Sequence, residues 1–130
     1  MKLYDLIKGV AETGLPDTEI TCITSDTRTE MKAGGMFVCI KGAVFDGHNA
    51  AAEMLEKGAS VVVAERDLGL DRQIIVEDTR AAYPMLCSAW FGHPEKKLKL
   101  VGVTGTNGKT TTTALTGAIM KTFFDEVFVV

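Results

Sequence analysis

A glycine- and lysine-containing turn constrains the fold of this chain more than any other feature. The segment GTNGKT, residues 105–110, lies between an apolar run at residues 98–104 and a helix-forming segment that begins near Lys109. A strand followed by a tight glycine turn and a helix is typical of α/β proteins with parallel sheets. The sequence therefore predicts this strand, turn and helix, with a second strand at residues 126–130.

The residues of the turn suit phosphate binding. Gly105 and Gly108 allow the backbone to fold tightly, so that its N–H groups face phosphate oxygens. The amino terminus of the following helix adds unpaired N–H donors and a partial positive charge. Lys109 can reach the outer phosphates of a nucleotide, and Thr110 can offer its hydroxyl to Mg²⁺. These properties predict a nucleotide phosphate site.

Two alternatives to this interpretation stay open. The loop is two residues tighter than G-x-x-x-x-G-K-[ST] if it opens at Gly105. A glycine turn that only caps a helix would leave Lys109 solvated, but gives no reason for Lys–Thr at the helix start. A dinucleotide-binding turn is the other alternative, since Asp125 and Glu126 follow about 20 residues later. That motif requires a G-x-G pair, which the loop lacks.

The preceding residues alternate between strand-like and helix-like patterns. Helices are predicted at residues 3–8, 49–57 and 79–91, and strands at residues 19–26, 34–42, 59–65 and 72–78. The apolar run at 34–42 predicts a strand buried on both faces, Asp78 is the expected N-cap of the third helix, and Gly58 is expected just after the second. This alternation predicts an α/β domain at residues 1–95 and the start of another at 96–130.

Composition and charge exclude several classes of protein. The net charge is −3 and no basic stripe is present, so a nucleic-acid partner is not expected. The apolar runs are too short to cross a bilayer, and Asp5 and Lys8 interrupt any secretion signal. Cys22, Cys39 and Cys87 are odd in number with no C-x-x-C pair, which indicates reduced thiols in a cytoplasmic protein.

Several motifs taken together carry a family resemblance. They are ITSDTR at residues 23–28, GGMFVCIKG at 34–42, FDGHNAAAEMLEKGASVVVAE at 45–65 and WFGHPEKKLKLVGVTGTNGKT at 90–110. With these motifs the chain resembles the Mur ligase family, which couples ATP to amide-bond formation on cell-wall precursors. Within the family it is most similar to the branch that adds the third amino acid. The resemblance implies a UDP-MurNAc-substrate-binding domain at residues 1–95 and the first β-α-β unit of a Rossmann-like ATPase domain at 96–130.

The resemblance also implies cofactors and partners. ATP and Mg²⁺ are expected, with UDP-MurNAc-L-Ala-D-Glu and either meso-diaminopimelate or L-lysine as substrates, joined through an acyl phosphate. A monomer with no membrane partner is expected. Two alternatives remain: the sibling ligase that adds D-alanyl-D-alanine, and a non-catalytic module that binds UDP-sugars.

Site residues follow from the resemblance position by position. The ATP loop corresponds to Gly105, Thr106, Asn107, Gly108, Lys109, Thr110 and Thr111, with Lys109 catalytic and Thr110 at the metal. Contacts to the uridine nucleotide correspond to Ser25, Thr27, Ala43, Val44 and Phe45. Thr27 stands where the family usually has serine, which keeps the hydroxyl.

Each substrate-side assignment has a structural alternative. The segment SDTR is also typical of a turn in which Asp26 bonds local backbone and pairs with Arg28. Val44 and Phe45 also suit a core, and a helix-capping role is favoured over substrate contact for His48. Family members are several times longer than this chain, so we expect the isolated 130 residues to be inactive in ligation. The first 90 or so are expected to fold independently and retain weak UDP affinity.

Overall fold

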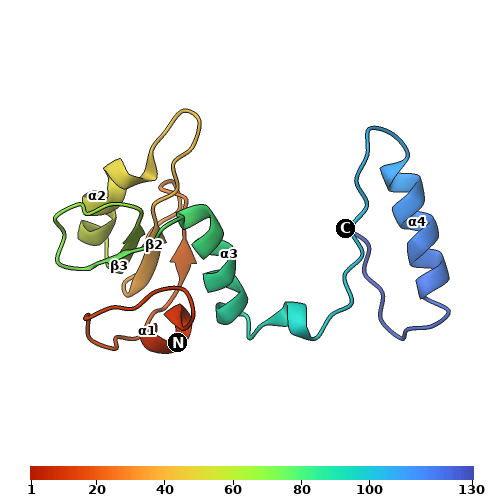
Figure 1. Cartoon of the computed structure of the whole chain (residues 1–130), viewed down its shortest axis with the longest axis horizontal. Coiled ribbons are helices and arrows are strands. Elements are labelled where there is room, and N and C mark those ends of the chain that lie inside the picture. Colours follow the sequence, from red (N-terminus) through yellow and green to blue (C-terminus); the bar gives the residue numbers. More distant parts are fainter. The chain divides into compact units, whose positions relative to one another are not determined.

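The computed structural model describes all 130 residues and divides them into two compact units (Figure 1). The first unit is Met1–Lys97 and the second is Leu98–Val130. The two units are described separately below.

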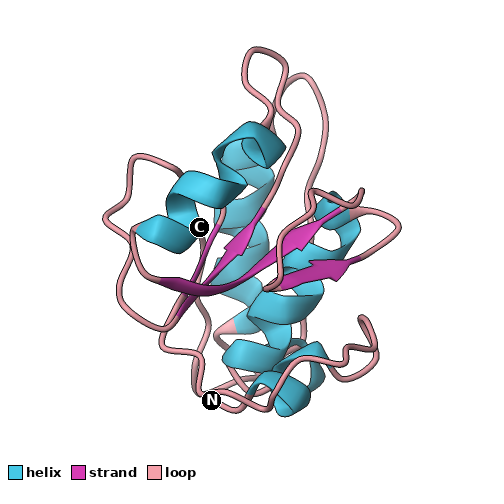
Figure 2. Ribbon diagram, turned by 90° about the vertical axis from the view of Figure 1, so that its left-hand side faces the viewer, coloured by secondary structure: helices cyan, strands magenta, loops and turns pink.

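The first unit is built on a four-stranded, entirely parallel sheet. Its strands are β1 (Ile23–Thr24), β2 (Gly35–Val38), β3 (Ala59–Ala64) and β4 (Gln73–Ile75), adjacent in that order. The helices are α1 (Leu3–Ile7), α2 (Ala51–Glu56) and α3 (Thr79–Trp90), with short 3₁₀ helices η1 (Gly47–Ala50) and η2 (Pro94–Lys96). The strand arrows point the same way in Figure 2. The predicted α/β fold class is confirmed.

Both faces of the sheet are buried. Met36 and Val38 of β2 join a core cluster formed with residues of α1 and α3. Phe37 and Cys39 join a second cluster formed with residues of α2. All four residues of β2 are buried, which confirms the predicted strand with two covered faces. The result is a layer of helices, a parallel sheet and a second helical layer.

The ends of α2 and α3 follow the predicted capping chemistry. The Asp78 carboxylate accepts hydrogen bonds from the backbone N–H groups of Arg80 and Ala81, at 2.7 and 3.0 Å. Gly58 follows the C-cap of α2 with a φ of +115°. Pro84 lies inside α3, where its ring nitrogen carries no hydrogen, so one backbone donor of the helix is missing.

The predicted strand at residues 19–26 is mostly not a strand of the sheet. Only Ile23–Thr24 pairs with β2. Glu19 and Ile20 instead pair with the chain start: Glu19 bridges Lys2, and the Ile20 N–H donates to the Met1 carbonyl at 2.8 Å. The backbone of this segment is thus satisfied by the amino terminus, and Ile20 is fully buried.

The second unit contains one helix, α4 (Lys109–Met120), which begins where the sequence predicts. The predicted strands at residues 98–104 and 126–130 are absent, so that part of the prediction is wrong. Two parallel segments without further strands gain little from pairing with each other. Val129 instead packs against Gly117, the buried residue of α4. No helix of either unit is long and apolar enough to span a membrane.

Packing of α3 on the sheet yields a first prediction. Leu86 is fully buried in the cluster shared with α1, whereas its neighbour Met85 is 49% exposed. Leu86→Ala should lower the free energy of unfolding by about 2–5 kcal/mol, because it leaves a cavity in the core. Met85→Ala should change it by less than about 0.5 kcal/mol. Urea denaturation of both variants checks this, and equal effects would contradict the assigned packing.

Candidate nucleotide-binding site

Four chain segments meet at the carboxyl ends of the parallel strands. Residues 25–28 follow β1, residues 41–46 come after β2, residues 65–66 follow β3, and residues 79–80 come after β4. Because the strands are parallel, these segments share one edge of the sheet, here called the carboxyl edge. Ligands of open α/β sheets bind at this edge, so it is the candidate substrate site of the first unit.

The segment after β1 is a turn closed by an ion pair. The Asp26 carboxylate accepts from the Arg28 backbone N–H at 2.9 Å and from its guanidinium at 2.8 and 2.9 Å. These bonds to Arg28 lower the pKa of Asp26 to about 2. The turn that was given as the structural alternative for SDTR is therefore present. Ser25 and Thr27 flank Asp26 and are half-buried, with Thr27 inside the same turn.

The segment after β2 is a small hairpin with an apolar tip. Lys41 and Asp46 form its closing bridge, and the Gly42 N–H donates to the Phe45 carbonyl at 2.8 Å. Val44 is fully exposed and Phe45 is 52% exposed. The alternative that placed these two side chains in the core is wrong, because the hairpin projects beyond the end of the sheet. Exposed apolar side chains beside polar groups suit contact with a flat base or sugar.

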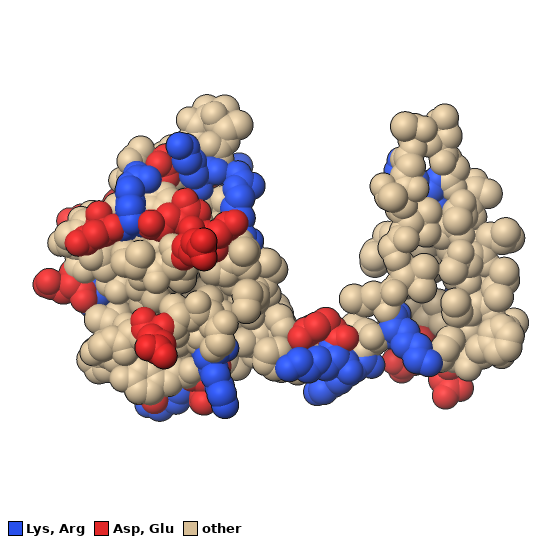
Figure 3. All heavy atoms as spheres, in the orientation of Figure 1, with Lys and Arg blue, Asp and Glu red and all other residues tan.

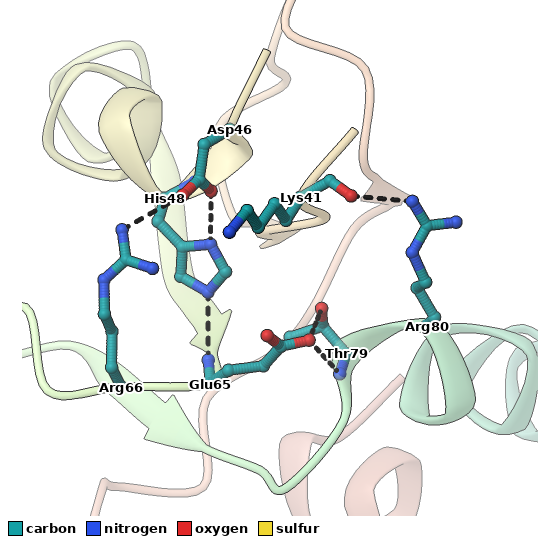
Figure 4. Close-up of polar contacts among 7 residues, drawn as sticks. All are labelled: Lys41, Asp46, His48, Glu65, Arg66, Thr79 and Arg80. Carbon is teal, nitrogen blue, oxygen red and sulfur yellow. Dashed lines mark hydrogen bonds and ion pairs between the residues drawn. The ribbon is translucent and has the colours of Figure 1, made fainter. Parts of the chain in front are cut away.

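A buried histidine fastens the base of this hairpin to the sheet (Figure 4). The His48 ring is 2.6 Å from Asp46 through Nδ1, and its Nε2 lies 3.0 Å from the backbone nitrogen of Glu65. Since a backbone N–H can only donate, Nε2 is the acceptor and Nδ1 carries the proton. The helix cap expected of His48 is supplied by Asp46, which accepts from the His48 backbone N–H at 3.0 Å.

The carboxylate of Asp46 is the most connected group of this network. The backbone N–H and ring of His48 lower the pKa of Asp46 to about 2, with Arg66 contributing through a contact of 3.2 Å. The side chain of Asp46 is only 21% exposed. It therefore remains ionised wherever the chain is folded at ordinary pH.

A second pair of contacts joins the same edge to α3. The buried Thr79 donates its hydroxyl to Glu65 at 2.7 Å and its backbone N–H to the same oxygen at 2.9 Å, which lowers the pKa of Glu65. The Arg80 guanidinium donates to the Lys41 carbonyl at 2.6 Å. The hairpin is thus held from β3 on one side and from α3 on the other.

Sequence reasoning missed most of these supporting residues. Lys41 and Glu65 lie inside motifs that carry the family resemblance but were given no role there, and Arg66, Thr79 and Arg80 lie outside every motif. Each of the five lies shortly after the end of a strand. Strand ends in a parallel sheet were the signal that could have found them. Figure 3 shows Lys and Arg gathered beside Asp and Glu on the upper part of this unit.

The phosphate loop in the second unit has the backbone shape that its sequence predicts. Gly108 is the N-cap of α4 with a φ of +75°, a conformation that other residues rarely adopt. No side chain caps α4, so the N–H groups of its first turn have no side-chain partner. The Lys109 ammonium donates to the Gly105 carbonyl across the loop. Free N–H groups beside an ammonium fit a polyphosphate.

The remaining residues of the loop lie at the surface. Thr106, Asn107, Thr110 and Thr111 are exposed. Thr113 instead bonds the helix itself, through the carbonyls of Lys109 and Thr110, as expected for a residue of the first turns. No group of three or more His, Cys, Asp or Glu side chains that could hold a metal ion is present.

Comparison with known proteins decides the family. Residues 19–86, just over half of the chain, match the Mur ligase family, catalytic domain. The chain belongs to the Mur ligase family. The resemblance inferred from the sequence motifs is thereby confirmed.

Relatives of this Mur ligase chain carry related names. It is 44% identical over 122 residues to the UDP-N-acetylmuramoyl-L-alanyl-D-glutamate--2,6-diaminopimelate ligase of Bacillus licheniformis, covering 92% of this chain and 25% of that protein. It is 42% identical over 123 residues to UDP-N-acetylmuramyl-tripeptide synthetase 2 of Oceanobacillus iheyensis, covering 88% and 25%. The chain thus spans about a quarter of the length of these relatives.

Solved structures support the same fold. A crystal structure of MurF from Acinetobacter baumannii matches with a TM-score of 0.69 and 31% identity, over 92% of this chain and 27% of that one. MurF ligase from Thermotoga maritima, in complex with ADP, matches with a TM-score of 0.56 and 32% identity, over 78% and 23%. The Mur ligase chain therefore shares the fold of the matching part of these two MurF enzymes.

The ionisation of Asp46 yields a prediction about pH. A pKa held at about 2 in the folded chain, against 3.8 ordinarily, means that the Asp46 carboxylate stabilises the fold above pH 3.8. This contribution should be lost as the pH falls through 2. Carbon-13 NMR titration of the Asp46 carboxyl should give a midpoint near 2, and the stability difference between wild type and Asp46→Asn should shrink over the same range. A midpoint near 3.8 would contradict the network.

Proposed function

We propose that the chain is part of an ATP-dependent ligase that adds the third amino acid to UDP-MurNAc-L-Ala-D-Glu in the cytoplasm. The observation that carries the proposal is the 44% identity, over 92% of the chain, to a protein named for that reaction. The two candidate sites support it, because one suits a nucleotide substrate and the other a polyphosphate. The incoming amino acid is meso-diaminopimelate in preference to L-lysine, since several relatives are named for the former.

The first unit binds the uridine nucleotide in this proposal. The half-buried hydroxyls of Ser25 and Thr27 donate to the nucleotide from the turn after β1. The exposed tip Ala43, Val44 and Phe45 covers the uracil and ribose. Apolar surface at this tip gains most from being buried by a ligand, because it is otherwise in contact with water. We therefore assign the predicted substrate-binding domain, residues 1–95, to the first unit, Met1–Lys97.

The second unit binds ATP at residues 105–111. The N–H groups of the first turn of α4 hold phosphate oxygens, and Lys109 exchanges its contact with the Gly105 carbonyl for the outer phosphates. Mg²⁺, with Thr110 in its coordination sphere, would neutralise phosphate charge. Lys109 offsets the charge that develops as the γ-phosphoryl group passes to the substrate carboxylate.

Phosphoryl transfer explains why a ligase needs this loop. A carboxylate oxygen is a poor leaving group, whereas phosphate leaves readily from an acyl phosphate. Attack by the amine of the incoming amino acid on the acyl carbon forms the amide bond and releases phosphate. The loop and Lys109 act in the first of these two steps.

A sibling activity is the second candidate. The matching solved structures are MurF enzymes at 31–32% identity, so addition of D-alanyl-D-alanine to a tripeptide substrate is the alternative. The higher identity to the diaminopimelate ligases favours the first activity. A monomeric protein that binds UDP-sugars without turnover is the third candidate.

A chimaera tests the proposed reaction. In the chimaera, this chain replaces the matching residues of the Bacillus licheniformis ligase. ATP-dependent formation of UDP-MurNAc-tripeptide from labelled diaminopimelate is then measured. Lys109→Ala should lower kcat by about 100-fold, because it removes the positive charge that stabilises the transferring phosphoryl group in the transition state. Lys121→Ala, at the far end of α4, is the matched control and should leave the rate unchanged. Activity only with D-alanyl-D-alanine would overturn the assignment.

Nucleotide binding is tested on the 130-residue chain directly. Titration with UDP should shift NMR signals of residues 25–28 and 43–45. Thr27→Val should weaken UDP binding by about 1 kcal/mol, because a methyl group replaces the hydroxyl and its hydrogen bond is lost. Thr27→Ser keeps the hydroxyl and should bind UDP as the wild type does. If UDP moves signals elsewhere and not at the carboxyl edge, the assigned uridine site is wrong.

A further inference from the structure

His48 occupies an unusual position for a histidine near a ligand site. Its side chain has no exposed surface, although Phe45 and Val44, a few residues away, are exposed. A ring closed off from solvent cannot touch a nucleotide bound at the carboxyl edge. Its function must therefore act through the residues that it contacts.

The contacts of His48, which lies in η1, connect the hairpin after β2 to the end of β3. Asp46 belongs to the closing bridge of the hairpin, and its Oδ1 lies 2.6 Å from His48 Nδ1. The backbone N–H of Glu65, directly after β3, donates to His48 Nε2 at 3.0 Å. These two hydrogen bonds in series tie the hairpin to the end of a central strand. We call this arrangement the Asp46–His48–Glu65 brace.

Glu65 extends the brace to the neighbouring helix. Its carboxylate accepts two hydrogen bonds from Thr79, the first residue of α3. The opposite stem of the hairpin is held from the same helix, because Arg80 donates to the Lys41 carbonyl. Both stems are thus fixed, one to the end of β3 and the other to α3 (Figure 4).

We propose that His48 is a positioning residue that, as the neutral Nδ1–H tautomer, holds the hairpin so that its Ala43–Phe45 tip is ready to receive the nucleotide. The identity of the ligand in this inference rests on the proposed function. The brace itself rests only on the hydrogen bonds of His48. A hairpin fixed before binding loses less conformational entropy when the ligand arrives, which raises affinity. Losing the ring leaves the Glu65 backbone N–H without its acceptor and frees one stem of the hairpin.

Two conservative variants separate the halves of the brace. His48→Gln places an amide oxygen near the position of Nε2, so it keeps the contact with Glu65 but loses the donor to Asp46. His48→Asn places an amide nitrogen near the position of Nδ1, so it keeps the contact with Asp46 but loses the one with Glu65. Asn49→Ala, at the exposed neighbouring position, is the matched control.

UDP affinity of the folded chain is the first measurement. We expect each His48 variant to weaken UDP binding about tenfold, the lower end of the effect of removing a contact that orients a binding group. Asn49→Ala should bind as wild type. Leu86→Ala, which is destabilised at a distant core position, should also bind UDP as wild type when folded. A tenfold loss in Leu86→Ala as well would mean that affinity only follows stability, and would overturn the proposal.

Two measurements without ligand keep the brace testable if UDP does not bind. Nitrogen-15 NMR of the His48 ring should show a protonated Nδ1 and an unprotonated Nε2. Amide exchange at Gly42, whose N–H closes the hairpin, should speed up in both His48 variants but not in Asn49→Ala. A protonated Nε2 or unchanged exchange would overturn the brace. Failure of wild type to bind UDP, with both results as expected, would overturn only the proposed ligand.

Discussion

The parallel pairing of β1 to β4 is the constraint on which the rest of the first unit depends. Parallel strands require a connection that returns to the starting edge, so each strand delivers its carboxyl end to the same place. Four segments separated by up to about 55 residues thereby become neighbours. The apolar residues of β2 and β3 hold this pairing in place by burying both faces.

At the carboxyl edge, polar contacts fix the position of the hairpin after β2, as apolar packing fixes the strands in the core. The sheet alone would leave the hairpin after β2 free to move, since its tip is exposed. The Asp46–His48–Glu65 brace and the bond from Arg80 to Lys41 restrict its two stems. Hydrogen bonds that are shielded from water are stronger than exposed ones. The buried ring of His48 therefore restricts the hairpin more firmly than an exposed side chain would.

The phosphate loop follows a different logic, because it depends on few residues outside itself. Gly108 and the start of α4 create the free N–H groups locally, and Lys109 closes the loop on Gly105. A strand before the loop is not required for this shape, as the absence of the predicted strands shows. The sequence therefore predicted the loop and the first residue of α4 correctly, whereas its prediction of the flanking strands was wrong.

The sequence by itself determined the α/β class, the buried strand β2, the caps of α2 and α3 and the start of α4. These features depend on local patterns of apolar residues, glycine and aspartate, which act within a few residues. Only the tertiary structure decided that Glu19 and Ile20 pair with the chain start, that Val44 and Phe45 are exposed, and that His48 is buried. Those outcomes depend on which distant backbone groups satisfy each other, and the contact of His48 with Glu65 spans 17 residues that no local pattern connects.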